Sequence, residues 1–405
     1  MPTNHTLLTP TKIAKRSLVL LENALAMGNN VHRAYKEEFV DPKAGGSVNI
    51  RKPVRFRATK SRVRSDSDVL EYNTGVDINT QAHVAWKFNT QDLTLTIEEY
   101  TERYIKPAIV TLADTVDLDL TGLYSDINNQ VGTPGTTPST FAHIGAAMQR
   151  LDELAAPRDN RKIIVDPAAQ WSVMDGLKGL FDTKRVRDVV NRGYLGQVAN
   201  AEVHMDQNIR KHTVGAHGGT PRGNGAPAAG ATQIVTDGWT ASTAVLKAGD
   251  VFTIAGVKEV NPVNGQSTGT LKQFVSLTDV TSDGTGNATI TVYPAGDSGP
   301  GLQFAGAYQN CSIQPPDNGA ITVVGTASTE YPQNLVFQQN AFALVTCPLN
   351  MPQGVWGERA TSKLSGLSIR IIKDYDSKED EEIVRLDILY GVKTLYPDLG
   401  VRLVG

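Results

Sequence analysis

The stretch between residues 232 and 325 constrains the fold more than any other part of this sequence. Threonine, valine and glycine dominate it, and dipeptides typical of tight turns recur along it. These dipeptides are Asp237-Gly238, Asn264-Gly265 and Asp283-Gly284. This spacing of short strands and turns predicts a small all-β domain, either a barrel or a sandwich. Because the texture on both sides is mixed, we expect an inserted domain that follows a Gly-, Pro- and Ala-rich linker at residues 211–231.

The chain around this insertion alternates between helical and strand patterns. Apolar residues at helical spacing predict helices at 141–151 and 167–180, and short apolar runs predict strands at 162–165 and 202–205. After the insertion we expect an apolar strand pair within 334–347, followed by strands at 367–373 and 383–394 joined by an acidic turn, residues 374–382. A chain of 405 residues is long enough for two or three domains, so the fold class predicted is α+β.

A long helical pattern runs from residue 98 to about residue 128, with apolar residues every three or four positions. At about 1.5 Å per residue, this helix would span roughly 45 Å. Glu98, Glu99 and Glu102 lie in its first turns, where acidic side chains complement the helix dipole. Pro107 should kink the helix or restart it. Just before this helix, the alternation over residues 84–97 predicts two strands with a turn near residue 90.

Residues 10–27 predict an amphipathic helix, because Leu18, Leu21 and Leu25 recur at spacings of three and four. Gly28 and the two asparagines after it should end the helix. The helix stands before the main domains in the sequence. It can therefore pack on its own subunit or dock on a neighbour, and both possibilities stay open.

Residues 41–80 predict a long two-stranded hairpin that has little core of its own. Val48, Ile50, Val54 and Phe56 alternate with polar residues, as in a strand. Seven basic residues lie between positions 51 and 64 without any acid among them: Arg51, Lys52, Arg55, Arg57, Lys60, Arg62 and Arg64. An isolated hairpin is marginally stable in water, so this segment needs a surface to lie on.

Composition excludes several classes of protein. A net charge of −3 argues against a strongly basic nucleic-acid-binding domain. Cys311 and Cys347 are too few for a disulfide scaffold, and buried free thiols are expected, although one bridge is possible. Without a signal-peptide core or a membrane-spanning run, the protein is expected to be cytoplasmic when made.

A search for catalytic and ligand-binding motifs finds none above background. The glycines at 215–225 lack the Gly-Lys-Ser/Thr ending of a phosphate loop. His212 and His217 have no metal-ligand spacing and are expected in a flexible loop. Asp114, Asp117 and Asp119 favour a solvated or inter-subunit helix face over a magnesium site. We therefore predict no catalytic residue, cofactor or metal, and no enzyme.

The order of parts resembles the Hong-Kong-97-like capsid fold. Within that fold, the sequence is similar to the coat-protein family of the short-tailed Salmonella phage P22. The stretches that carry this likeness are Leu7-Leu8-Thr9-Pro10 with Ile13-Ala14; Tyr35, Glu38 and Phe39; Ile50-Arg51-Lys52-Pro53-Val54-Arg55-Phe56; residues 98–108; residues 246–257, the clearest match; residues 334–349; and Tyr390-Gly391-Val392. One departure is that the segment between Gly230 and Leu246 is too short for the long loop by which family members contact a neighbouring capsomer. The hairpin at 259–271 is a candidate substitute.

The resemblance implies a structural major capsid protein that self-assembles into an icosahedral phage head around double-stranded DNA. It implies pentamers and hexamers, a scaffolding protein, a portal, non-specific proximity to packaged DNA and no membrane. The protein would reside in the virion after assembly in the bacterial cytoplasm. The implied parts are an N-terminal arm (1–40), an extended loop (41–80), a peripheral domain (81–135 and 366–405), an axial domain (136–228 and 326–365) and an inserted barrel-like domain (229–325).

The basic segment is the predicted contact between subunits. We expect Arg51, Lys52, Arg55, Arg57, Arg62 and Arg64 to meet acidic groups of an adjacent copy, either Glu98, Glu99 and Glu102 or the turn at 374–382. The alternative is that these charges only keep the hairpin soluble. Two rival classes for the whole chain are an exported β-rich adhesin, which needs an export signal, and an enzyme with a β insertion, which needs a catalytic set.

Overall fold

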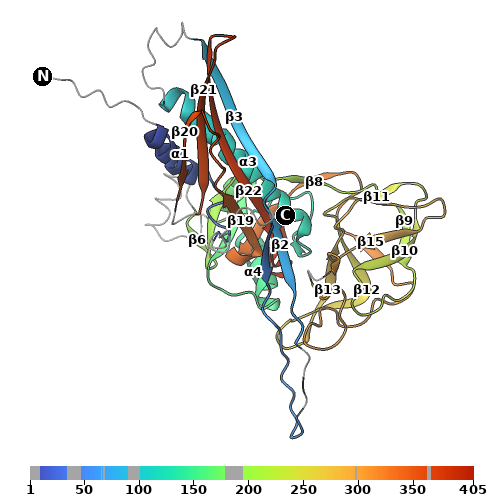
Figure 1. The fold of residues 1–405 in the computed structure, drawn as a ribbon. Coiled ribbons are helices and arrows are strands. Elements are labelled where there is room, and N and C mark those ends of the chain that lie inside the picture. The colour runs from blue at the N-terminus through green and yellow to red at the C-terminus, as the bar shows by residue number, and fades with distance from the viewer. Residues whose placement is uncertain are drawn as a thin grey trace, which may run out of the picture. The chain divides into compact units, whose positions relative to one another are not determined.

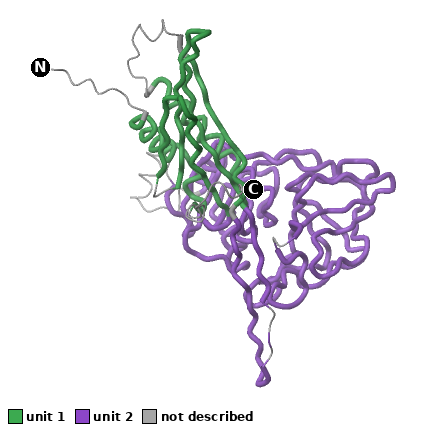
Figure 2. The backbone as a smooth tube through the Cα atoms, in the orientation of Figure 1, with its two compact units in different colours: residues 1–48, 76–120, 342–393 green, residues 49–75, 121–341, 394–405 purple. Residues whose placement is uncertain are grey.

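The structure is a computed structural model that describes residues 10–33, 47–64, 66, 69–89, 101–177, 195–296, 299–362 and 366–405. The chain forms two compact units, each built from segments that lie far apart in the sequence (Figure 2). Unit 1 comprises residues 1–48, 76–120 and 342–393, and unit 2 comprises residues 49–75, 121–341 and 394–405. Helices and strands occur in both units, which confirms the α+β class.

Unit 1 is built on a five-stranded sheet in which long antiparallel strands lie side by side (Figure 1). Its strands are β3 (Thr80–Asn89), β19 (Phe342–Cys347), β20 (Trp356–Thr361), β21 (Ser368–Asp376) and β22 (Glu381–Thr394). The order is β19-β22-β21-β20, and β3 also pairs with β22. On β22, Val384, Leu386, Ile388 and Tyr390 are buried at every second position, which is the period of a strand with one face on a core. The strands predicted at 367–373 and 383–394 are therefore confirmed.

Two helices belong to this unit. Helix α1 (Pro10–Ala24) packs its Leu18 and Leu21 face against β20 and β21, and it ends three residues before the predicted boundary. A π-helical turn (Thr101–Ile105) precedes α3 (Lys106–Gly122), and a 3₁₀ turn (Leu123–Asp126) of unit 2 follows it. Pro107 has no N–H to continue the preceding turn, which accounts for the restart of the α-helix at this point. The second strand predicted near 93–97 lies outside the described residues.

Asp117 and Asp119 of α3 bind groups of their own chain, which corrects for these two the expectation of a solvated or inter-subunit face. The Asp117 carboxylate is 2% exposed and accepts hydrogen bonds from the Ala26 amide at 2.6 Å and the Gly28 amide at 2.8 Å. Asp119 accepts one from the Tyr390 hydroxyl at 2.6 Å. Burying a carboxylate requires such partners. These two side chains therefore fix α3 to the end of α1 and to the sheet.

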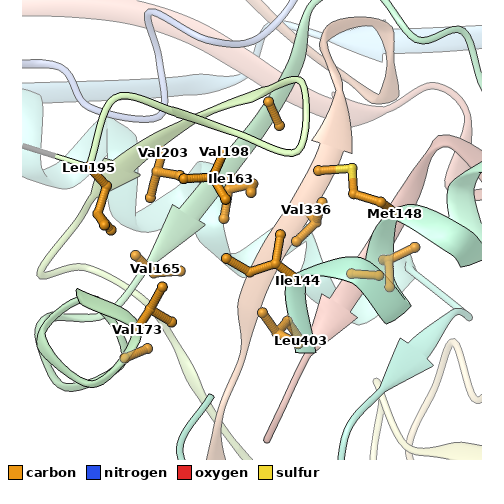
Figure 3. Packing of buried hydrophobic residues seen from close by; sticks show 14 of the residues in the cluster. Ile144, Met148, Ile163, Val165, Val173, Leu195, Val198, Val203, Val336 and Leu403 are labelled. Carbon is orange, nitrogen blue, oxygen red and sulfur yellow. The ribbon is translucent and has the colours of Figure 1, made fainter. Parts of the chain in front are cut away.

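The α/β part of unit 2 is a six-stranded mixed sheet in the order β4-β23-β18-β5-β7-β6. Its strands are β4 (Gln130–Val131), β5 (Arg161–Val165), β6 (Gln197–Val198), β7 (Ala201–Met205), β18 (Asn334–Gln338) and β23 (Gly400–Leu403). Helices α4 (Phe141–Glu153) and α5 (Pro167–Leu177) supply Ile144, Met148 and Val173 to the core on this sheet (Figure 3). Strands β18 and β19 are both formed as predicted, but they belong to different sheets and not to one pair.

Ala155, just after α4, gives a test of backbone strain. Its φ is +57°, a conformation that costs an L-residue about 1–2 kcal/mol and costs glycine almost nothing. Ala155→Gly should therefore stabilise the unassembled chain by about 0.5–1 kcal/mol, after the larger chain entropy of unfolded glycine is subtracted. Denaturant unfolding measures the change. Ala156→Gly, at a neighbouring buried position without positive φ, should destabilise instead, and the same sign for both variants would contradict this account.

The remaining part of unit 2 is all β, as predicted for 232–325. Its strands are β9 (Gly219–Gly223), β10 (Gln233–Trp239), β11 (Ala244–Leu246), β12 (Val251–Val260), β13 (Ser267–Val275), β14 (Val280–Thr281), β15 (Ala288–Thr291) and β16 (Ile321–Val323). They form three small sheets, β15-β10-β9, β11-β14 and β13-β12-β16, around one core that includes Phe252 and Phe274. Among the described strands these sheets do not join into a closed barrel. We call this part, residues 215–325, the inserted β unit.

Two expectations for this region were wrong. The segment at 211–231 is not simply a linker, because β8 (Lys211–Thr213) pairs with β17 (Glu330–Pro332) and β9 pairs with β10. Asp237-Gly238 is not a turn between strands. It lies within β10 at a break in the register with β9, where Gly238 has a φ of +73°. A glycine with positive φ is typical of β-bulges as well as of turns. The Asp-Gly dipeptide alone therefore could not distinguish a bulge within a strand from a turn between strands.

Candidate interaction surface

The basic segment is a hairpin only at its base. Strand β1 (Ser47–Arg51) pairs with β2 (Asn73–Asp77), and the Lys52 amide donates to the Tyr72 carbonyl at 2.8 Å. Beyond that bond, the described residues between the two strands have no regular strand structure. We call residues 52–72 the extended loop. The predicted pairing is confirmed, but it is much shorter than the predicted long hairpin.

The basic side chains near the base of the loop are held by their own chain. The Arg57 guanidinium donates through Nη1 to the Gln309 Oε1 at 3.0 Å. Arg55 lies 3.8 Å from the Asp398 carboxylate, with both side chains more than a third exposed. Lys52 lies over the Tyr396 ring, 5.7 Å from its centroid. These half-buried groups are therefore less available to a neighbour than the sequence pattern implied, while Arg51 is exposed.

The outer part of the extended loop carries the most exposed charges. Lys60, Arg62 and Arg64 are all exposed, and we call these three residues the loop tip. Arg64 makes an ion pair with Asp66 at 2.6 Å, but the side chains are 85% and 73% exposed, so the pair is worth only about 0–1 kcal/mol. Val63 at 74% and Val69 at 60% are exposed beside them. A charged segment with exposed apolar side chains has the composition of a contact surface.

The predicted acidic partners lie in two places, at the start of the long helix and in the acidic turn. Glu98 and Glu99 lie outside the described residues. Glu102 lies in the π-helical turn, and its side chain is also outside the description. The acidic turn, residues 374–382, is described. It carries six acidic residues and one lysine, and Asp374, Glu379 and Asp380 are exposed.

The side chains of the acidic turn are partly organised. The Tyr375 hydroxyl donates to the Asp380 carboxylate at 2.7 Å, while the Tyr375 side chain is 55% exposed. Lys373 pairs with Glu382, and Lys87 pairs with Glu381 at 2.8 Å. Glu381 and Glu382 are thus already paired with lysines, and the exposed acids of the turn are Asp374, Glu379 and Asp380.

The hairpin at 259–271 contacts its own chain on one side. The Asn261 side-chain amide donates to the Glu153 carbonyl, just before the end of α4, at 2.7 Å. Val263 and Leu271 remain 70% and 42% exposed. The expectation that this hairpin also reaches a neighbouring capsomer stays a prediction.

The two histidines expected in a flexible loop are both bonded. His212 is 6% exposed, with Nε2 at 2.8 Å from the Asp250 carboxylate and Nδ1 at 3.0 Å from the Tyr124 hydroxyl. His217 is half-buried, and its Nε2 lies 3.3 Å from the Gly325 carbonyl. The loop assignment was wrong for His212, because β8 brings it into the interior, whereas His217 does lie between β8 and β9, outside regular secondary structure. Among the described residues, no group of three or more His, Cys, Asp or Glu side chains could hold a metal ion.

Cys311 and Cys347 are free and buried, as predicted. Burial raises the pKa of the Cys311 thiol to about 12, so the thiol stays protonated at neutral pH. No helix in the described part of the chain is long and apolar enough to cross a membrane.

Sequence reasoning missed a buried ionic cluster in unit 2. Glu259 of β12 is 1% exposed, and its carboxylate accepts from Arg150 of α4 at 2.9 Å and from Lys272 of β13 at 2.7 Å. The Arg150 guanidinium also donates to Asn129 Oδ1 at 3.1 Å and to Thr270 Oγ1 at 2.9 Å. Lys272 stands two residues before Phe274 and therefore lies on the same, buried face of β13. A lysine in that inward position is the sequence signal that could have indicated a buried anion beside it.

Comparison with known proteins gives a consistent result. The model of the family described as "P22 coat protein - gene protein 5" matches residues 1–405. The chain is similar to a major capsid protein of Acyrthosiphon pisum secondary endosymbiont phage 1, with 20% identity over 428 aligned residues covering 97% of each chain. Among solved structures, it is similar to one of Mycobacterium phage Che8 (13% identity, 93% of this chain and 90% of that one, TM-score 0.49). It is also similar to the capsid of Ralstonia phage GP4 (9% identity, 93% and 87%, TM-score 0.47).

Proposed function

This chain belongs to the P22 coat protein family, and we propose that its copies join through the extended loop, whose basic tip meets the acidic turn of an adjacent copy. The chain is thus a structural major capsid protein of a phage head, located in the virion, and not an enzyme. Copies of it build the icosahedral shell. The adhesin and enzyme classes are set aside by this family membership.

The observation that carries the proposal is the charge difference between two exposed segments. Residues 51–64 hold seven basic residues and no acid, whereas residues 374–382 hold six acids and one lysine. Opposite charges on protruding segments steer association and fix register more than they add affinity. Each exposed pair contributes about 0–1 kcal/mol, so joining needs many repeated weak contacts, which suits a shell that must correct errors during growth.

Reversal of the loop tip tests the proposal. The triple variant Lys60→Glu, Arg62→Glu and Arg64→Glu should leave the monomer folded but lower the yield of shells at least tenfold, because it places like charges opposite one another. Electron microscopy and sedimentation of assembly reactions measure the yield. Arg55 and Arg57 are not used, because each has a partner in its own chain and its reversal would disturb the loop itself.

Two controls sharpen this test. Reversing Arg222, Lys247 and Lys258, which are exposed in the inserted β unit, changes the net charge by the same amount and should leave assembly near the parental level. Replacing Asp374, Glu379 and Asp380 by lysine should impair assembly alone and restore it in combination with the reversed tip. Normal shells from the tip variant would contradict the proposal, and the alternative that the loop charges only confer solubility would replace it.

The wider assembly is proposed on the same family basis. Subunits would form pentamers and hexamers around a scaffolding protein, with a portal at one vertex and packaged DNA near the inner face without sequence recognition. The parts of the chain would follow the predicted division into an N-terminal arm, extended loop, peripheral, axial and inserted domains. The three sheets around one core support a compact inserted domain with a barrel-like arrangement.

A further inference from the structure

The two limbs of the extended loop are bridged by a tyrosine of the inserted β unit. The Tyr308 hydroxyl accepts a hydrogen bond from the Arg55 amide at 3.1 Å and donates one to the Leu70 carbonyl at 2.8 Å. Its ring meets Tyr72 edge-on, with centroids 5.1 Å apart and planes at 82°. Tyr308 is 9% exposed. One hydroxyl thus supplies a cross-link between the limbs beyond the point where the β1–β2 ladder stops.

A second contact lies beside the first. Gln309 accepts the hydrogen bond from Arg57, and the guanidinium of Arg57 rests against Gly265. A Cβ atom at position 265 would lie 2.4 Å from Arg57 Cζ, so the absence of a side chain there makes room for the arginine. Gly265 has a φ of +71°, which also favours glycine. The loop base is therefore held by two segments of the inserted β unit, one at 308–309 and one at 265.

These two segments are themselves fixed to the α/β part of unit 2. Cys311, three residues after Tyr308, forms a β-bridge with Glu259. Glu259 in turn binds Arg150 of α4 through the buried ionic cluster. Gln273 adds a reciprocal pair, accepting from the Gln130 amide at 2.7 Å and donating to the Gln130 carbonyl at 2.9 Å. A path of contacts, buried at Arg150, Glu259 and Cys311, therefore connects the α/β part of unit 2 to the limbs of the loop.

We infer that the inserted β unit is a brace that sets the direction of the extended loop, and that Tyr308 is a positioning residue for the joining of subunits. The inference rests on the proposed function of the loop tip. A two-stranded ribbon with little core is marginal on its own. A loop that is already directed loses less conformational freedom when it binds, so bracing it accelerates and strengthens association without adding any contact to the neighbour.

Removal of a single oxygen atom tests this inference. In the full-length, unassembled chain, Tyr308→Phe keeps the ring against Tyr72 and removes both hydrogen bonds. Hydrogen exchange of peptides covering residues 53–57 and 69–72 should become about five- to tenfold faster, as expected for the loss of one net hydrogen bond. The assembly rate should fall by a similar factor while the midpoint of global unfolding stays within error. Gln309→Ala should give the same effects, more weakly.

Tyr331→Phe is the matched control. Its hydroxyl is also buried in unit 2 and accepts a bond from the Thr326 amide at 3.2 Å, but it does not touch the loop. Tyr331→Phe should change neither the hydrogen exchange of the loop peptides nor the rate of assembly. Unchanged loop exchange in Tyr308→Phe would overturn the brace. If hydrogen exchange of the loop peptides is faster in Tyr308→Phe but the assembly rate equals that of the parent chain, the positioning role of Tyr308 is overturned. If the tip-reversal variant assembles normally while Tyr308→Phe still loosens the loop, the proposed contact has failed and the brace itself has not.

Discussion

Glu259→Ala is expected to lower the free energy of unfolding of the unassembled chain by about 3–5 kcal/mol, because it removes the shared anion from a buried cluster. Arg150 and Lys272 both donate to this carboxylate, and Lys272 is only 2% exposed. Burial alone would lower the pKa of Lys272, but the Glu259 charge outweighs it and raises the pKa. Without Glu259, two buried cations face each other with no anion between them.

Denaturant unfolding at pH 7 measures this change, and hydrogen exchange locates it. Protection should fall first in β12 and β13, which carry Glu259 and Lys272. Glu153→Ala is the matched control. Its carboxylate lies 3.5 Å from the same arginine but is 22% exposed, so its removal should cost only about 0–1 kcal/mol. Equal losses from the two variants would contradict a special role for the buried carboxylate.

High pH gives a second test of the same cluster. Because the pKa of Lys272 is raised in the folded chain, its contribution to stability is fully present below the unfolded value, near 10.4, and is lost as the pH rises through the folded value. The parent chain should therefore keep this contribution from neutral pH to about pH 10 and lose it above, whereas Glu259→Ala, in which only burial acts on Lys272, should not show this loss.

Local patterns were enough to predict most elements of the fold. The period-two burial of β22, the apolar stripe of α1 and the short apolar run of β5 all follow from residue spacing. The restart of the helix near Pro107 follows from the missing N–H of proline. These features depend on neighbours within a few residues, which is the range over which sequence reasoning is strongest.

Features that depend on distant partners were not predictable. His212 is buried because β8 pairs with β17, more than a hundred residues away, and because Asp250 and Tyr124 supply its hydrogen bonds. Arg57 was assigned to a neighbouring copy, yet Gln309 of the same chain binds it. A charge count shows where basic residues gather but not which of them are already occupied within the subunit.

The basic segment was identified in the sequence, but its parts could not be told apart there, and its role as a contact between subunits stays a prediction. In the structure Lys52, Arg55 and Arg57 contact groups of their own chain, whereas Arg51 and the three residues of the loop tip are exposed. This division has a physical consequence, because an exposed charge can change partners during assembly at little cost. At the base, Arg57 binds Gln309 of the inserted β unit, while Arg55 and Lys52 contact Asp398 and Tyr396 near the C-terminal strand β23.

Asp387→Asn is expected to destabilise unit 1 by about 3 kcal/mol, because it leaves the Arg370 guanidinium, only 11% exposed, without its anion. Asp387 has a fully buried side chain, although it lies on the face of β22 opposite the apolar core positions. Its carboxylate accepts from Arg370 at 2.8 Å, from Arg385 at 2.7 Å and from the Gln81 amide at 3.1 Å. One carboxylate thus joins three neighbouring strands, β3, β21 and β22.

The pH dependence of this effect has a defined sign. Burial raises the pKa of Asp387, but the hydrogen bonds from Arg370, Arg385 and Gln81 outweigh it and lower the pKa below its usual value. Its contribution is therefore present above the unfolded pKa, about 3.9, and is lost as the pH falls through the folded value. The stability difference between parent and Asp387→Asn should be constant between about pH 5 and 8, where the carboxylate is ionised in both the folded and the unfolded chain, and should shrink below about pH 4.

Unfolding of the parent and the variant over this pH range measures the prediction. Asp374→Asn, at an exposed position of the same hairpin, should change stability by less than about 0.5 kcal/mol at every pH. A difference that persists unchanged at pH 3 would mean that Asp387 acts through its shape and not its charge. A difference that vanishes on acidification would instead establish that the long sheet of unit 1 is held together across β3, β21 and β22 by a single buried anion, in the same way that Glu259 holds the inserted β unit to α4.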